Sequence, residues 1–139
     1  MSKRIILMFA AGLLSIAFLV SGGLAAPADA TVAPNGDGQF KSVQDAINAA
    51  PAGTRERPWV IHIKPGVYKE LVYVQREKRF LRLEGEDAAK CVLTYGLHAG
   101  VAGPDGKPIG TFRTASTLID ADDFAAENLT FENSAGPVG

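Results

Sequence analysis

The sequence predicts an all-β chain whose short strands coil in parallel, with one short helix near the start of the coil. The clearest indication is the segment Ile61–Glu70, which reads IHIKPGVYKE. Ile61 and Ile63 alternate with polar residues, as in a half-buried strand, and Pro65-Gly66 then ends the strand before apolar residues resume. A short strand, a tight corner and a second short strand are typical of a chain that coils, not of one that forms hairpins.

Residues 1–30 are predicted to be a signal peptide, and residues 31–139 the exported domain. A basic start precedes an apolar run from Ile5 to Val20, and Ala28-Asp29-Ala30 fits a signal-peptidase site. Cleavage after Ala26 is an alternative. An uncleaved membrane anchor is the competing interpretation, because the run is near the shortest length that spans a bilayer. Small residues follow the run where a stop-transfer segment would carry basic ones, which favours cleavage and a secreted chain, extracellular or periplasmic.

The exported part is expected to begin with a short strand at residues 31–33, a turn at residues 34–38 and then the helix. Ser42 can cap the helix, with Asp45 three residues later as its reciprocal partner. Pro51 ends the helix. The apolar side chains that fall on one helical face are Val43, Ala46, Ile47 and Ala50.

Three later segments share the order apolar, polar, apolar, charged: residues 61–64, 81–84 and 129–132. Gly or Asn follows each segment within two residues. Their starts are 20 and 48 residues apart, and 48 residues correspond to about two turns of a solenoid. We therefore expect an additional turn of the coil near residue 105, within the loop Gly100–Ile109. Barrels and sandwiches also have closely spaced short strands. Against them, no two-residue Asn-Gly or Asp-Gly hairpin joins two clearly alternating strands here.

The charge argues against a nucleic-acid partner, and the cysteine content excludes an internal disulfide. Loss of residues 1–30 removes Lys3, Arg4 and Asp29, which leaves 12 basic and 14 acidic residues and a net charge near −2. So weak a charge, without a basic aromatic patch, argues against nucleic-acid binding. Cys91 is the single cysteine, so packing must stabilise the fold, and we expect this thiol to be buried and inert.

The sequence predicts no metal site and no other cofactor. The acidic cluster at residues 120–123 lies in a predicted turn, where solvated carboxylates are commoner than a calcium site. His62 and His98 are far apart, without a Cys or second His at ligand spacing. Asn128-Leu129-Thr130 matches the N-glycosylation sequon, and we expect it to be unmodified on a packed strand.

Four stretches, taken in order, resemble the N-terminal part of a pectinesterase (pectin methylesterase), a family of right-handed parallel β-helix enzymes. They are VAPNGDGQF at 32–40 with the helix that follows, G-x-Y-x-E at 66–70, TFRTAS at 111–116 and Phe124–Pro137, which contains TFENSAG. Together they cover nearly all of residues 31–139. The resemblance implies a right-handed parallel β-helix with an N-terminal capping helix. Because the chain stops at Gly139 without an atypical capping unit, we expect the β-helix to be incomplete at its C-terminal end.

The resemblance implies hydrolysis of galacturonate methyl esters in pectin, without a metal. In the family one Asp is the nucleophile, a second Asp donates and accepts a proton, and a Gln amide stabilises the oxyanion. Those groups, with an Arg and a Trp that hold the polymer, belong to Q-A-x-A-[LI], Q-D-T, D-x-I-F-G and Arg-Pro-Trp-like stretches. None of these occurs here, and Trp59 is not the family's substrate Trp. We assign no catalytic residue and expect this chain to be inactive.

Thr111 is the one substrate-binding residue that the resemblance implies, since it directly precedes Phe112 at the position of the family's substrate-binding threonine. The alternative is a strand-edge threonine before a core phenylalanine. The loop from Gly100 to Gly110 would border a polymer groove or be a tolerated insertion. The three motif residues predicted to be structural, as a corner glycine, a packed ring and a carboxylate that satisfies nearby groups, are Gly66, Tyr68 and Glu70.

The sequence therefore predicts a pectinesterase-like carbohydrate esterase, which acts in cell wall modification and pectin catabolism. Its partner would be methylated homogalacturonan, with no nucleic acid, no membrane after cleavage, and a monomer at full length. Two other functions stay open: a non-catalytic pectin-binding β-helix module, and a β-helix polysaccharide lyase, which would follow if downstream sequence lacked the two aspartate motifs.

Overall fold

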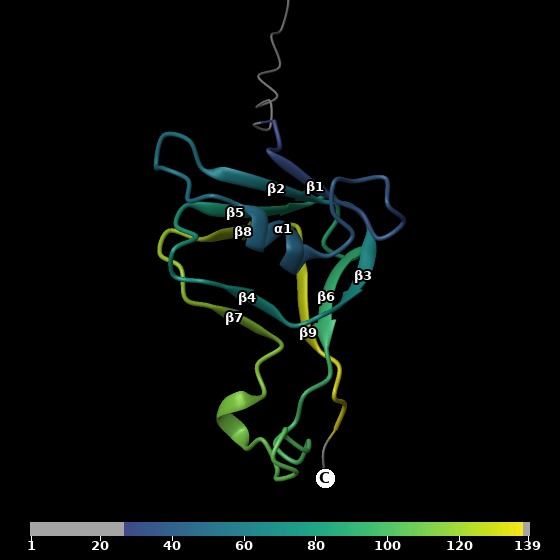
Figure 1. The fold of residues 1–139 in the computed structure, drawn as a ribbon. Helices are drawn as coiled ribbons and strands as arrows, with labels where there is room; N and C mark the ends of the chain where they lie inside the picture. The colour runs from purple at the N-terminus through teal and green to yellow at the C-terminus, as the bar shows by residue number, and fades with distance from the viewer. Residues whose placement is uncertain (1–26, 138–139) are drawn as a thin grey trace, which may run out of the picture.

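The structure, a computed structural model, describes residues 27–137 and shows a single coiled body in three sheets (Figure 1). Most of the predicted signal peptide, residues 1–26, lies outside the described residues. Among the described residues, no helix has the length and apolar character needed to cross a membrane.

All strand pairs in the three sheets are parallel. The first sheet has the order β1 (Ala30–Val32), β2 (Trp59–Ile63), β5 (Leu81–Gly85), β8 (Ala125–Glu127). The second has the order β3 (Gly66–Lys69), β6 (Cys91–Tyr95), β9 (Thr130–Asn133). The third pairs β4 (Val72–Val74) with β7 (Thr117–Ile119). From β2 onward, strands that follow one another along the chain lie in different sheets, so the predicted parallel β-helix is confirmed.

The predicted spacing of the coils is wrong in one respect. Coil 1 comprises β2, β3 and β4, coil 2 comprises β5, β6 and β7, and coil 3 begins with β8 and β9. The strand that continues β2 and β5 is β8, whereas residues 129–132 fall mainly in β9, which pairs with β6. No additional coil lies near residue 105, because residues 96–116 form one excursion between β6 and β7. The alternation at residues 129–132 thus identified a strand but not the sheet to which it belongs. The excursion at residues 96–116 shows that a corner of the coil can hold a long insertion while the strands on either side stay stacked.

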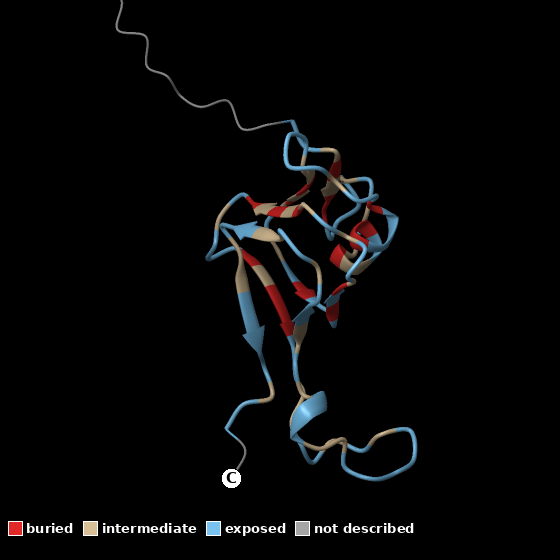
Figure 2. Cartoon of the chain, turned by 90° about the vertical axis from the view of Figure 1, so that its left-hand side faces the viewer, coloured by how far each residue is buried: buried red, intermediate tan, exposed pale blue. Residues whose placement is uncertain are grey.

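The core is a set of columns in which side chains of successive coils lie on one another. Ile61 lies opposite Leu83 in the first sheet, and Tyr68 opposite Leu93 in the second. These four residues are almost completely buried, which stabilises the fold by about 1.5–3 kcal/mol for each fully buried apolar side chain. Burial is concentrated in coils 1 and 2 (Figure 2), and it declines in coil 3, where Phe131 continues the Tyr68–Leu93 column but remains 41% exposed.

Helix α1 (Val43–Ala49) packs on β1, β2 and β4 and covers the coil 1 end of the core. Ser42 caps it as predicted, accepting a hydrogen bond at its Oγ from the Asp45 amide at 3.2 Å. Val43, Ala46 and Ile47 face the core as expected. The carboxylate at this helix terminus, however, belongs to Glu70 and not to Asp45.

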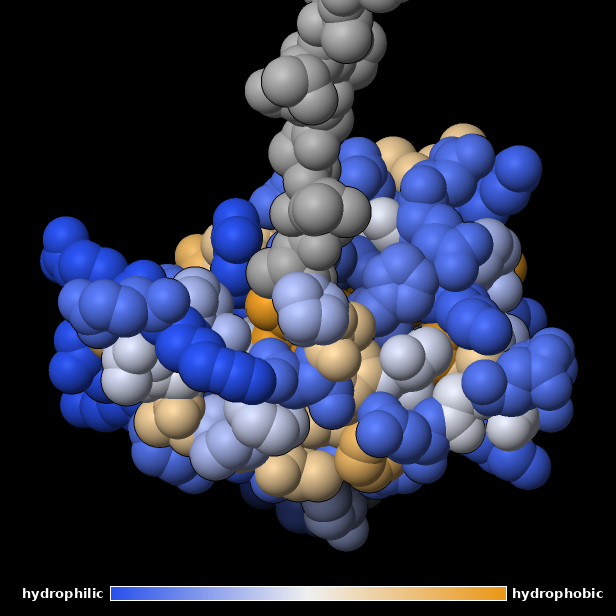
Figure 3. Space-filling model, turned by 90° about the horizontal axis from the view of Figure 1, so that it is seen from above, coloured by the Kyte–Doolittle hydropathy of each residue, from blue (hydrophilic) through white to orange (hydrophobic). Residues whose placement is uncertain are grey.

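The outer face of the first sheet carries polar side chains between the buried positions. His62 pairs through Nε2 with the Glu86 carboxylate at 3.0 Å, and the Arg82 guanidinium pairs with Glu127 at 2.9 Å. Seen from above, the molecule is mainly hydrophilic, with apolar atoms in small separate areas (Figure 3). The polar residues of the alternating strands thus point to solvent, as the period of two requires.

Three further expectations concern single positions. Cys91 is free and buried, with its Sγ 3.3 Å from the Ile63 carbonyl oxygen, as expected. Asn128 is not on a packed strand: it is exposed at the corner between β8 and β9, where its φ of 54° is left-handed. Asn tolerates that region better than most residues, which explains its place at a corner. The first strand begins at Ala30, one residue earlier than predicted.

Candidate functional site

Thr111 lies on the loop formed by residues 96–116, which projects away from the coiled body between β6 and β7 (Figures 1 and 2). It begins a short 3-10 turn, Thr111–Arg113, and it is exposed. The Phe112 ring is fully exposed. The alternative of a strand-edge threonine before a core phenylalanine is therefore wrong, because both residues lie on a turn outside the core.

The outer part of this loop is a small hairpin held by its own backbone. The Gly103 amide donates to the Lys107 carbonyl at 2.7 Å, and the Ile109 amide donates to the Val101 carbonyl at 2.8 Å. Gly110 follows with a φ of 73°, a conformation that favours glycine, and it turns the chain into the Thr111 segment. The loop is thus an ordered excursion rather than an extra coil.

The base of the loop is joined to coil 3 by one side chain, that of Asn133 at the end of β9. Asn133 Nδ2 donates to the carbonyls of Leu97 at 2.9 Å and Thr114 at 3.3 Å. Asn133 Oδ1 accepts from the Leu97 amide at 3.2 Å and from the Ala135 amide at 3.1 Å. Thr114 Oγ1 in turn donates to the Thr111 carbonyl at 2.9 Å. A chain of two bonds therefore connects Asn133 to the Thr111 turn.

Sequence reasoning gave Asn133 no role of its own, although it lies within one of the matching stretches. The signal that could have identified it is an amide directly after a strand, since an Asn side chain can bond backbone groups of neighbouring segments. Those segments, around Leu97 and Thr114, are remote in the sequence, so only the fold reveals them as its partners.

The motif at residues 66–70 lies at the opposite end of the core from coil 3. Gly66 turns the chain against Pro34, and an added Cβ would lie 2.6 Å from the Pro34 Cγ. Glu70 accepts hydrogen bonds at the start of α1 from the amides of Val43 at 2.8 Å and Gln44 at 2.9 Å. The carboxylate thus satisfies amides that the helix itself leaves without partners.

The Tyr68 ring fills the core of coil 1, and its hydroxyl donates to the Lys64 carbonyl at 2.7 Å. The Val32 carbonyl lies 3.4 Å from the same oxygen. The pKa of Tyr68 is raised to about 12. Burial is the largest cause, and the nearby Cys91, Glu70 and Glu86 make smaller contributions. The Tyr68 hydroxyl and the Glu70 carboxylate both hold backbone groups of coil 1, whereas Thr111 lies on the loop between β6 and β7, so the structure does not bring the three together in one site.

Two carboxylates of the acidic cluster at residues 120–123 are occupied by structural partners. Asp120 pairs with Arg76 at 3.3 Å, which raises the pKa of the Arg76 guanidinium, and Asp123 pairs with Arg79 at 3.2 Å. Within residues 27–137, no group of three or more His, Cys, Asp or Glu side chains could hold a metal ion.

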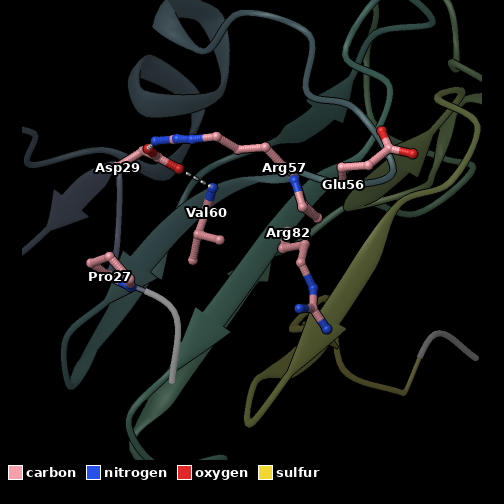
Figure 4. Close-up of a pocket in the computed structure, with 7 residues that line it drawn as sticks. Pro27, Asp29, Glu56, Arg57, Val60 and Arg82 are labelled. Atoms are coloured by element: carbon pink, nitrogen blue, oxygen red, sulfur yellow. Dashed lines mark hydrogen bonds and ion pairs between the residues drawn. The ribbon is translucent and has the colours of Figure 1, made fainter. Parts of the chain in front are cut away.

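A cavity of about 170 Å³ lies beside the first strands, between Pro27, Arg57 and Arg82 (Figure 4). Its one well-buried carboxylate is Asp29, which accepts from the Arg57 guanidinium at 2.5 Å and from the Val60 amide at 2.9 Å. Both charged groups are therefore used to hold the start of the chain against β2. Glu56 is a second carboxylate on the cavity wall, but Asp29 is not free to act with it as an acid–base pair, because Asp29 already bonds Arg57 and Val60.

The pectinesterase family model matches residues 29–139 of the chain. The chain is 43% identical over 112 residues to "Probable pectinesterase/pectinesterase inhibitor 23" of Arabidopsis thaliana, which covers 81% of this chain and 19% of that protein. It is 39% identical over 113 residues to "Pectinesterase 31" of the same plant, which covers 75% and 34%.

Two solved structures have the same fold over most of this chain. Pectin methylesterase PemA from Erwinia chrysanthemi superposes with a TM-score of 0.71 and 38% identity, over 81% of this chain and 32% of that one. Pectin methylesterase from carrot gives 0.70 and 31%, over 81% and 33%. A pectin methylesterase of the same similarity has been solved in complex with a hexasaccharide. The chain thus spans about a fifth to a third of the length of these proteins.

Proposed function

The chain belongs to the pectinesterase family, and from that premise we propose that it forms the first coils of a carbohydrate esterase that hydrolyses galacturonate methyl esters in pectin. The observation that carries this proposal is the continuous family match from residue 29 to residue 139, which includes the loop with Thr111. The relatives are three to five times as long as the matched region, so the ester hydrolysis is attributed to the longer architecture.

Within that architecture, Thr111 is proposed to contact the sugar polymer. Its side chain is exposed, and among the described residues its hydroxyl has no hydrogen-bond partner. A hydroxyl and the neighbouring backbone can bond the carboxyl and hydroxyl groups of galacturonate units. A hexasaccharide bound to a related pectin methylesterase supports an oligosaccharide as the kind of ligand.

The 139 residues are proposed to be catalytically inert without the rest of that architecture. Covalent ester hydrolysis by carboxylates needs a nucleophile, a proton donor and an oxyanion contact in one place. The part-buried carboxylates Asp29 and Glu70 instead bond backbone amides and structural partners. The sequence stretches that carry the family's catalytic groups do not occur in the chain.

We further propose that the protein is secreted, extracellularly or into the periplasm, and that the full-length protein is monomeric. The secretion proposal rests on the apolar run and small residues at its start, which lie outside the described residues. Detection of the protein in the medium or periplasm of an expressing cell, with a shortened N-terminus, tests it. Retention of the intact chain in the membrane would contradict it.

The functional test uses the purified chain with methylated pectin and, separately, with oligogalacturonate. We expect no methanol release and weak binding by calorimetric titration. Thr111→Val should weaken that binding by about five- to tenfold, the value of one hydrogen bond. The matched control is Thr31→Val, on the first strand and away from the loop. Methanol release would overturn the inert assignment, and equal affinities of the two variants would overturn the role of Thr111.

A non-catalytic pectin-binding module is the second candidate, and one observation favours it. The exposed loop presents Thr111 and a fully exposed Phe112 to a ligand. Calorimetry decides this candidate: micromolar affinity for oligogalacturonate by the isolated chain would support it, and no heat at millimolar ligand would exclude it.

A further inference from the structure

We propose that Asn133 is a positioning residue that fixes the Thr111 turn on the coiled body. The effect of Asn133 on substrate rests on the proposed function, in which Thr111 contacts the sugar polymer. The part that concerns the loop itself rests only on the geometry around Asn133.

The Asn133 amide is used to its full hydrogen-bonding capacity. It has two N–H donors and an oxygen with two acceptor positions. The donors bond the Leu97 and Thr114 carbonyls, and the oxygen accepts from the Leu97 and Ala135 amides. Leu97 lies on the stem that leaves β6, and Thr114 lies on the stem that returns to β7. One side chain therefore holds both stems at once.

Little else attaches this loop to the body. Within residues 27–137, Asn133 is the only residue outside the loop whose side chain bonds it. At its end, the Val72 amide donates to the Ser116 carbonyl at 3.0 Å, which anchors the return to β7 but not the Thr111 turn. The loop side chains are mostly exposed, and Phe112 packs on nothing in the core. The direction in which the loop projects thus depends on Asn133.

The contact reaches Thr111 through Thr114. The Thr114 carbonyl accepts from Asn133, and the Thr114 hydroxyl donates to the Thr111 carbonyl. Loss of the first bond frees the stem on which the second depends. Thr111 would then sample several orientations, and a ligand would have to select one of them, which lowers its apparent affinity by the fraction in the competent state.

The test compares Asn133→Asp with Ser134→Asp in the full chain. Asp keeps the size and both acceptor positions of Asn but replaces the two donors by a charge that faces two carbonyl oxygens. Ser134→Asp adds the same charge at the next residue, while the backbone bond from its amide to the Tyr95 carbonyl is kept. Amide hydrogen exchange of the loop and core, and titration with oligogalacturonate, are measured for both variants.

For Asn133→Asp we expect the Leu97 amide, which bonds Asn133 directly, to exchange up to roughly tenfold faster, a change of about 1.4 kcal/mol at most. Core amides such as Leu83 should keep their exchange rates, and affinity for oligogalacturonate should fall by a similar factor. Ser134→Asp should change neither. A general structural defect would accelerate the core as well, which would overturn the assignment to loop positioning.

Unchanged loop exchange in Asn133→Asp would also overturn the inference, and so would a freed loop that binds oligogalacturonate as tightly as the unaltered chain does. Absence of binding by the unaltered chain has a different meaning. It would overturn the sugar-binding role of Thr111 in the proposed function, while the exchange rates would still decide whether Asn133 holds the loop.

Discussion

The Glu70 carboxylate accepts a hydrogen bond from the Ser42 hydroxyl at 2.6 Å, and this contact joins the first coil to the helix that covers it. The same carboxylate accepts from the amides of Val43 and Gln44. Negative charge at a helix N-terminus also interacts favourably with the helix dipole. A residue that follows β3 therefore completes the cap of a helix that comes 26–28 residues earlier in the sequence.

Removal of this carboxylate should loosen the cap helix. Glu70→Ala leaves two helix amides and the Ser42 hydroxyl without their acceptor, and we expect a loss of about 2–4 kcal/mol in the free energy of unfolding. Glu70→Gln keeps one acceptor and should lose about 1–2 kcal/mol. Urea denaturation measures both. Glu77→Gln, at an exposed turn position, is the control and should change little. An equal effect of Glu70→Gln and Glu77→Gln would contradict the capping role.

The Tyr68 hydroxyl should make stability depend on pH in the alkaline range. Burial raises its pKa from 10.0 to about 12, so the folded chain holds this proton more tightly than the unfolded chain does. The contribution is therefore complete below about pH 10 and is lost as the pH rises to about 12, by about 2 kcal/mol in all. The slope of unfolding free energy against pH should be shallower in Tyr68→Phe over this range. Identical slopes would show that the hydroxyl is not the cause.

Gly85 should not tolerate a larger side chain. An added Cβ would overlap the Asn128 carbonyl oxygen, at the corner where coil 3 lies against coil 2. Gly85→Ala must displace backbone, and we expect it to cost about 3 kcal/mol in unfolding free energy. Gly96→Ala is the matched control, because its Cβ would have ordinary contacts at 3.5 Å. Similar thermal midpoints for the two variants would count against close stacking at this corner.

Asp29, just before β1, and Ala30, its first residue, should contribute to stability. The Asp29 amide donates to the Val60 carbonyl at 2.8 Å, its carboxylate accepts from Val60 and Arg57, and Ala30 pairs with Ile61. A chain that starts at Thr31 should lose about 1–2 kcal/mol relative to one that starts at Ala28. Urea denaturation of the two chains provides the comparison.

The same contacts bear on the predicted signal-peptidase site. Cleavage after Ala30 would remove residues that belong to the first sheet, so we expect the secreted form to begin at or before Asp29. N-terminal sequencing of the secreted protein tests this. A mature chain that begins at Thr31 and is as stable as the longer one would refute both expectations.

The sequence predicted where strands occur better than it predicted which strands pair with one another. The alternation in residues 61–64 and 81–84 correctly indicated two strands that lie side by side, because the same face of each must be buried. The same pattern at 129–132 indicated a strand but placed it in the wrong sheet. Alternation has a period of two in every sheet of a β-helix, so it carries no information on which side of the coil a strand lies.

The sequence by itself determined the short strands, the cap helix with Ser42 at its start, and the burial of Cys91, because hydrophobic period and corner residues act locally. The parallel coil, which the pattern alone left open against barrels and sandwiches, was predicted with the help of the family resemblance. Only the tertiary structure decided that Phe112 lies in solvent, that residues 96–116 form one excursion, and that Glu70 and Asn133 hold segments remote in the sequence. A hydrogen bond needs two groups within about 3 Å, and which distant backbone groups come that close is fixed by the stacking of coils.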